Sequence, residues 1–201
     1  MSRTFLIAFL LIPCCAFVLW GQEADSEMSP EQFQRYLYSA GLEFTMPEGF
    51  VQVPRKENPD LWYAFAVMSP DSAFEIRYSI WPLKQPLSDY EECLKDSNCM
   101  MVHPNRAFQG RAQANVMNMT DGAGGSTLQF PEDAVKEEFG ADMGGSAMFV
   151  FDCQFGEGYT YGQAIMLHKD DVADVLVTFM SKDMNTHRAY LGDVLHTVRF
   201  R

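Results

Sequence analysis

Residues 159–180 constrain the fold more than any other stretch, because they are typical of two long strands joined by a short polar turn. The first arm covers residues 159–168 and the second covers residues 173–180, and aromatic and β-branched side chains fill both arms. The turn between them, residues 169–172, carries the charge. The second arm is apolar on both of its faces, which is typical of a strand in the middle of a sheet. We therefore expect a central antiparallel hairpin with other elements packed on it.

The rest of the chain predicts an α+β fold with a mainly antiparallel sheet and helices packed on its faces. Strand-like segments follow one another across short turns, whereas helical segments occur at both ends and in the middle of the chain. Ser29 predicts the start of the first helix, and Asp183 or Asn185 predicts the start of the last one. Ser88, with Glu91 three residues later, predicts the start of a short helix in between.

Residues 74–80 show the clearest alternation of apolar and polar side chains in the chain. The polar side chains of this stretch are Glu75, Arg77 and Ser79. Strict alternation is typical of a strand with one face on the core and the other in water. We therefore predict that the sheet has a solvated face at this position.

The first residues have the three parts of a secretory signal. Arg3 provides a positive charge, residues 5–19 are almost wholly apolar, and Gly21 offers a small residue before a cleavage site. We place cleavage after Gly21, so that residues 1–21 form the signal peptide. A cut after Ala24 is the alternative.

The residues themselves disfavour two alternatives to cleavage. A retained membrane anchor would need a longer apolar run, without the interruption at Pro13. A lipid anchor on Cys14 would follow a proline and precede an apolar tail, and both features argue against it. No later segment is long and apolar enough to span a membrane. We therefore expect a secreted or periplasmic protein with a loose leader, residues 22–28, and a single α+β domain, residues 29–201.

The chain is strongly acidic, with 27 acidic and 15 basic residues and a formal net charge of −12. The phosphates of nucleic acids and anionic membrane surfaces both repel a body of this charge. We therefore expect no nucleic-acid partner, and we interpret the charge as a source of solubility.

Three cysteines remain after the predicted cleavage, namely Cys93, Cys99 and Cys153. An exported protein can keep disulfides, and a six-residue spacing allows Cys93 to bridge to Cys99 if the chain turns back between them. Cys153 lies in a strand-like stretch and is expected to be a small buried apolar residue, or alternatively to pair with another molecule. Sequence alone does not establish pairing geometry, so the bridge and two free thiols both stay open.

We find no established catalytic or metal-binding pattern in the sequence. The glycine-rich stretches at residues 122–125 and 144–146 lack the residues that complete a phosphate loop or a nucleophile turn, and the four histidines lack ligand spacing. One alternative is an acid–base site formed by His168 with Asp170 or Asp171. The simpler interpretation places these three residues at the polar tip of the central hairpin. We therefore predict no catalytic residue, no metal site and no cofactor.

Methionines are concentrated in the middle of the chain, at Met100, Met101, Met117, Met119, Met143 and Met148. Methionine adapts its shape to irregular neighbours, both in cores and at surfaces that bind varied partners. We interpret this group as filling of the core, with a binding surface as the alternative.

A strand and turn at residues 44–50, with the sequence Phe-Thr-Met-Pro-Glu-Gly-Phe, lead into a pair of strands. The long hairpin and a last helix then run into residues 198–200. In this order the chain resembles the Mog1/PsbP-like domains over most of residues 40–200, apart from residues 93–146. The resemblance implies a small α/β/α sandwich around an antiparallel sheet. Members of that fold perform unrelated binding or assembly tasks, generally without a catalytic centre, so it implies a binding or accessory role and assigns no function to any residue.

Together these observations predict an exported, non-catalytic domain that binds a protein or a small ligand. The first alternative is a small hydrolase-like enzyme that uses His168 with Asp170 or Asp171. The second is a structural subunit of an envelope assembly, with the methionine-rich segment as its interface. Neither the ligand nor the partner follows from the sequence.

Overall fold

The computed structural model describes residues 28–58, 60–151 and 154–201. The predicted signal peptide and all but the last residue of the predicted leader therefore lie outside the described residues, as does Cys153. Within the described ranges, no helix is long and apolar enough to cross a membrane.

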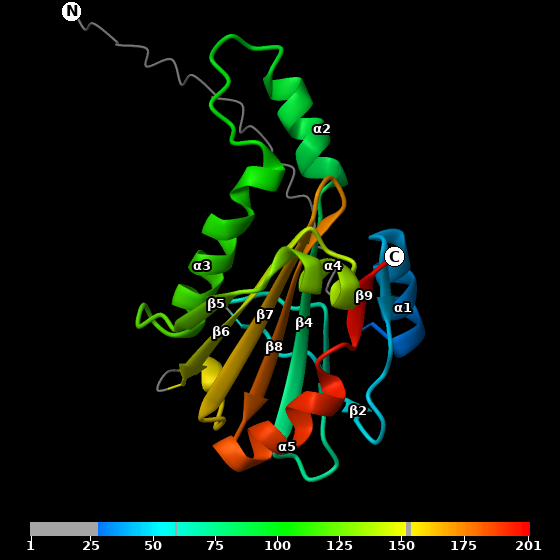
Figure 1. Cartoon of the computed structure of the whole chain (residues 1–201), viewed down its shortest axis with the longest axis vertical. Helices are drawn as coiled ribbons and strands as arrows, with labels where there is room; N and C mark the ends of the chain where they lie inside the picture. The colour runs from blue at the N-terminus through cyan, green and yellow to red at the C-terminus, as the bar shows by residue number, and fades with distance from the viewer. Residues whose placement is uncertain (1–27, 59, 152–153) are drawn as a thin grey trace, which may run out of the picture.

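One large antiparallel sheet forms the centre of the molecule (Figure 1). Its strands are β2 (Val51–Gln52), β3 (Phe65–Met68), β4 (Phe74–Pro82), β5 (Ser126–Gln129), β6 (Met143–Val150), β7 (Tyr161–Lys169) and β8 (Ala173–Ser181). Their order in space is β2–β3–β4–β8–β7–β6–β5. β7 and β8 are the arms of the predicted hairpin, and β8 lies in the middle of the sheet between β4 and β7. The predicted α+β class and the central hairpin are thus confirmed.

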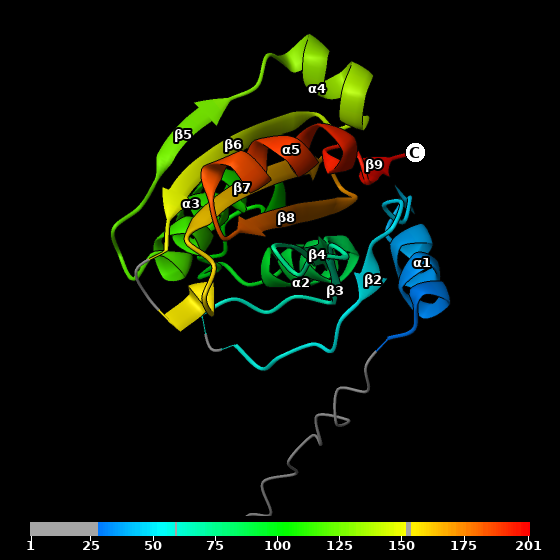
Figure 2. The ribbon, with the colours of Figure 1, turned by 90° about the horizontal axis from the view of Figure 1, so that it is seen from below.

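Helices cover both faces of this sheet (Figures 1 and 2). In the described part of the chain the α-helices are α1 (Pro30–Ser39), α2 (Lys84–Cys93), α3 (Phe108–Met119), α4 (Glu132–Phe139) and α5 (Met184–Val194). Side chains of α1, α4 and α5 join one core cluster, on the side that we call the α5 face. Side chains of α3 join a second cluster, on the side that we call the α3 face. A small two-stranded sheet of β1 (Leu42–Phe44) and β9 (Val198–Phe200) closes the α5 face.

The alternation of side chains along the strands explains the two cores. In β8 the fully buried Val175, Val177 and Phe179 belong to the core of the α5 face. Their neighbours Leu176 and Met180 belong to the core of the α3 face. Successive side chains of a strand point to opposite faces, so a strand that is apolar throughout must have packing on both sides.

The first and last helices begin where the sequence predicts. The Ser29 hydroxyl accepts a hydrogen bond from the backbone N–H of Gln32, which completes a capping box before α1. The Asp183 carboxylate accepts bonds from the backbone N–H groups of Asn185 and Thr186 before α5. Each cap satisfies N–H groups that have no partner within the helix.

The predicted start of α2 at Ser88 is wrong, because the helix already begins at Lys84. Pro86 falls in its first turn, where a residue without an N–H group costs nothing, since those groups have no partner within the helix. None of the residues of α2 is buried, and Figure 1 shows it projecting past the end of the sheet. A disulfide between Cys93 and Cys99, with Cα atoms 5.3 Å apart, closes the turn at its C-terminal end, as the first of the two sequence alternatives predicts.

Candidate functional site

A groove on the α3 face is a candidate ligand site. It lies between α3, β5, the first half of β6 and Met166 of β7, and it has a volume of about 480 Å³. Ligand sites are typically concave and measure roughly 300–1,000 Å³. The residues that line the groove are Phe108, Gln109, Ala112, Gln113, Val116, Met117, Gly124, Gly125, Thr127, Leu128, Gln129, Met143, Gly144, Gly145, Ser146 and Met166.

None of the residues that line this groove carries a charge. Met117, Met143 and Met166 provide flexible thioether side chains that fit irregular apolar shapes. Amide and hydroxyl groups, such as those of Gln113 and Thr127, can donate and accept hydrogen bonds. The groove therefore suits an uncharged ligand with an apolar body and a few polar groups.

Local sequence explains why α3 and β5 leave this space. Phe108, Val116 and Met119 are buried and anchor α3 to the sheet, whereas Gln113, between them in sequence, is exposed. In β6, Gly145 has no side chain to occupy the sheet surface beside β5. A Cβ atom at Gly145 would lie 2.9 Å from the carbonyl oxygen of Leu128, so a larger residue would push β5 away.

The methionine-rich segment divides between the core and the surface. Met119 is fully buried in the core of the α3 face, as the core-filling interpretation predicts. Met117 and Met148 are 40% and 41% exposed, and Met100 is 94% exposed, so the interpretation is wrong for these. Since Met117 lines the groove and Met148 lies on β6, the alternative of a binding surface fits these two residues better.

The predicted polar hairpin tip contains a buried ionic network. His168 on β7 is completely buried, and its Nδ1 lies 2.6 Å from an oxygen of Asp174 on β8. Its Nε2 lies 2.9 Å from an oxygen of Asp170, which is exposed. Asp171 is not part of this contact and instead exchanges hydrogen bonds with Asn105. The structure thus brings His168 to Asp170 and Asp174 but not to Asp171.

Helix α3 completes the network around His168. The guanidinium of Arg111 lies 3.0 Å from the second carboxylate oxygen of Asp174, and the ring of Phe108 stacks on the imidazole. Burial alone would lower the pKa of His168, but hydrogen bonds to Asp174 and Asp170 outweigh burial and raise that pKa above its usual value. Both ring nitrogens already contact carboxylates, and His168 does not line the groove. This geometry ties α3 to the hairpin and does not favour acid–base chemistry on a substrate.

The predicted solvated face at residues 74–80 is wrong, because Glu75, Arg77 and Ser79 are all buried. Arg77 is only 1% exposed, and its Nε lies 2.6 Å from the Glu75 carboxylate. The rings of Tyr63 and Phe155 cover its guanidinium at 4.8 and 5.3 Å. Alternation alone did not reveal that an arginine with carboxylate and aromatic partners can be buried on a sheet.

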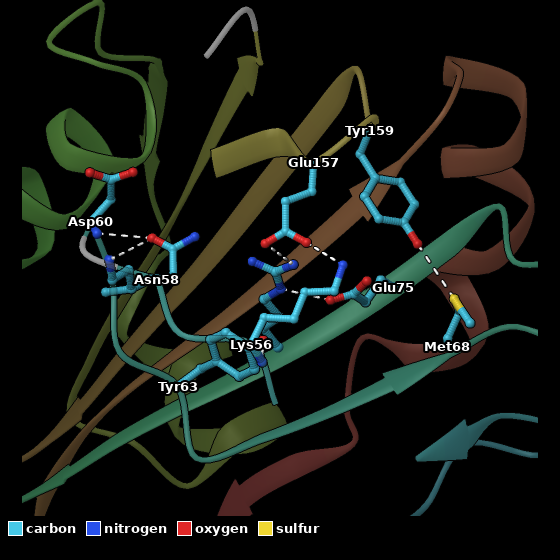
Figure 3. Close-up of polar contacts among 10 residues, drawn as sticks. Lys56, Asn58, Asp60, Tyr63, Met68, Glu75, Glu157 and Tyr159 are labelled. Atoms are coloured by element: carbon cyan, nitrogen blue, oxygen red, sulfur yellow. Dashed lines mark hydrogen bonds and ion pairs between the residues drawn. The ribbon is translucent and has the colours of Figure 1, made fainter. Parts of the chain in front are cut away.

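Glu157 links the buried arginine to a surface lysine (Figure 3). One of its oxygens lies 3.3 Å from Arg77, and the other binds the ammonium group of Lys56. Glu157 has a φ of +46°, a backbone conformation that costs energy for a residue with a side chain. Two opposite charges hold it there, so this network fastens the segment before β7 to the segment before β3.

A second buried histidine joins α5 to the sheet through uncharged groups. His187 Nε2 donates to the side-chain oxygen of Gln163 at 3.0 Å, and the Gln163 amide donates to Ser146 at 3.0 Å. The Ser181 hydroxyl donates to His187 Nδ1 at 3.2 Å. Burial lowers the pKa of His187, so this ring is neutral near pH 7 and can accept the Ser181 bond. The bonds orient α5 over the sheet.

Metal ligands do not gather at any of these places. Among the residues that the structure describes, no group of three or more histidine, cysteine, aspartate or glutamate side chains is arranged to hold a metal ion. The functional feature that sequence reasoning missed is the groove itself. Its only signals in the sequence are the glycines of β6 and the exposed glutamines of α3, and neither is specific.

Comparisons with known proteins concern the fold alone. No protein-family model and no curated protein matches the sequence. Among solved structures, the cyanobacterial PsbP of Synechocystis matches with a TM-score of 0.45 and 11% sequence identity, over 81% of this chain and 88% of that chain. The Ran-binding protein Mog1p of Saccharomyces cerevisiae matches with a TM-score of 0.39 and 10% identity, over 82% of this chain and 92% of that chain. Both matches agree with the Mog1/PsbP-like fold that the sequence resemblance implies, and the likeness concerns the fold alone.

Proposed function

We propose that this chain is an exported, non-catalytic domain that binds an uncharged, largely apolar ligand in the groove between α3 and β5–β7. The observation that supports this proposal is the uncharged lining of a groove of about 480 Å³. The disulfide between Cys93 and Cys99 is compatible with an oxidising compartment and so with the predicted export.

Filling the groove is expected to weaken the binding of a neutral apolar probe. Gln113 lines the groove on α3, whereas its neighbour Ala114 is exposed and does not line it. Fluorescence titration with N-phenyl-1-naphthylamine should show saturable binding at one site per chain. The Gln113→Trp variant should bind at least about tenfold more weakly, because the indole occupies the volume that the probe needs.

The Ala114→Trp variant is the matched control, since it adds the same side chain to the same helix outside the groove. It should bind the probe as the unchanged protein does. Equal binding by both variants, or a lack of saturable binding in the unchanged protein, would contradict the proposed site. An obligate oligomer whose interface covers the groove would instead favour the alternative of a structural subunit in an envelope assembly.

A further inference from the structure

Strand β5 forms one edge of the large sheet and leaves part of its backbone directed outward. The N–H of Phe130 donates to the carbonyl of Gly144, which makes these two a hydrogen-bonded pair. Hydrogen-bonded pairs alternate along antiparallel strands, so Ser126 and Leu128 also bond to β6. The N–H and C=O groups of Thr127 and Gln129 therefore point away from β6, and the sheet has no strand beyond β5 in the described part of the chain (Figure 2).

The two edges of the sheet differ in how they are protected. At the other edge, β2 has only two residues and is followed by Pro54, Arg55 and Lys56. A short strand, a proline and positive charges are the usual means of preventing a further strand from pairing. β5 has the sequence Ser-Thr-Leu-Gln, which contains no proline and no charge, and all four residues are exposed. This edge is open to pairing with another extended segment.

Each face beside the β5 edge offers a place for side chains of such a segment. On the α3 face lies the groove, which Thr127 and Gln129 help to line. On the α5 face, Leu128 lies opposite Ser146 and therefore shares a face with Met148 and Val150. These three apolar side chains are 66%, 41% and 56% exposed. A strand added to β5 would direct alternate side chains to the groove and to this apolar row.

Charge indicates which segments can approach. Between Ala112 and Val135 the chain has no lysine, arginine or histidine, but it has Asp121 before β5 and Glu132 and Asp133 after it. All three carboxylates are exposed, and that of Glu132 also forms an ion pair with Lys136. A segment with basic residues at its ends would be attracted to both ends of β5, whereas an acidic segment would be repelled by them.

We infer that the ligand of the proposed site is an extended peptide segment that pairs with β5 as an additional strand. Its uncharged, apolar middle lies in the groove, and its basic ends lie outside the groove. Backbone hydrogen bonds to Thr127 and Gln129 hold the segment, and alternate side chains enter the groove and cover the apolar row. This inference rests on the proposed function, because it specifies what occupies the groove.

The test is titration of the purified protein with a synthetic peptide of about eight residues, in which valine alternates with threonine between two terminal lysines and both chain ends are blocked. Calorimetry should detect binding, and NMR should show slower exchange of the Thr127 and Gln129 amides. The same peptide with a proline in its middle, or with glutamates in place of the lysines, should bind at least about tenfold more weakly.

Thr127→Pro removes an N–H group that points away from β6, so no bond to β6 is lost. Pro is tolerated at such edge positions. Thr127→Val loses the same hydroxyl but keeps the N–H group. The proline variant should bind the peptide about tenfold more weakly than the valine variant. Thermal denaturation of both variants should still show the unfolding transition of a folded domain. Equal affinities of the two variants would overturn the inference.

Two further outcomes separate the inference from the proposed function. If the protein binds N-phenyl-1-naphthylamine but not the lysine-ended peptide, the strand-pairing inference fails and the groove remains a ligand site. If light scattering instead shows a dimer that Thr127→Pro dissociates, the occupant of the edge is a second copy of the chain, and the inference is likewise wrong.

Discussion

Arg77→Ala is expected to lower the free energy of unfolding by about 3–5 kcal/mol, because it breaks a buried ion pair by removing only one partner. Glu75 is 5% exposed and would keep its negative charge without the guanidinium that contacts it. The rings of Tyr63 and Phe155 would also lose the guanidinium that fills the space between them. Urea denaturation at neutral pH measures the difference.

Two variants test the physical reason for this loss. Lys56 binds Glu157, as Arg77 does, but its side chain is 60% exposed. Lys56→Ala should therefore lower the free energy of unfolding by less than about 1 kcal/mol. Arg77→Met combined with Glu75→Met removes both charges and should recover much of the stability that Arg77→Ala loses, since apolar replacement of a buried pair is often neutral. A loss of less than about 1 kcal/mol in Arg77→Ala would show that the arginine is not essential to this core.

Asp174→Ala is expected to destabilise the protein by about 3 kcal/mol at about pH 6, and by less at about pH 9. Asp174 is the carboxylate closest to the buried His168 and also contacts Arg111. Because the pKa of His168 is raised in the folded state, the stabilisation by this pair is fully present below about pH 6.5, the pKa of a free histidine. It is lost as the pH rises through the folded-state pKa, so the unchanged protein should lose stability over this range. The variant keeps only the contact of His168 with Asp170 and should lose less.

Asp171→Asn provides the matched control, in the same turn but outside the ionic network. Asp171 has a φ of +62°, a conformation that asparagine also tolerates, and its partner Asn105 can bond to an amide. The variant should change the free energy of unfolding by less than about 0.5 kcal/mol and should keep the pH dependence of the unchanged protein. Identical pH profiles for Asp174→Ala and the unchanged protein would show that His168 is not the group responsible.

The sheet and its caps could be predicted because their signals are local. The apolar residues on both faces of β8 required a central position, and Ser29 and Asp183 provide hydrogen-bond acceptors where helices begin. The hairpin register was less accessible, because it depends on the length of one turn. Sequence placed residues 169–172 in the turn, whereas Lys169 pairs with Ala173 in the structure. That difference of one position brings His168 directly opposite Asp174 and creates the buried network.

The groove and the buried arginine depend on contacts between segments distant in sequence, so no local pattern could predict them. Arg77 is buried because Glu157, about eighty residues later, supplies a second carboxylate beside it. The groove exists because α3 packs over β6 and β7 but leaves β5 uncovered. The residue types along β4 or α3 do not by themselves predict the burial of Arg77 or the position of α3, because tertiary packing provides the free energy that fixes both.

The pairing of β1 with β9 joins residues near the start of the described chain to its last strand. Glu43 lies opposite Arg199, and the neighbouring helix α1 packs in the same core as Phe200. A ribosome makes the chain from its N-terminus, so β1 is made long before β9, the strand with which it pairs. Until residues 198–200 have been made, β1 has no partner strand and α1 lacks part of its core. The α5 face therefore cannot close on a nascent chain before residues 198–200 have been made, and its core stays incomplete until then.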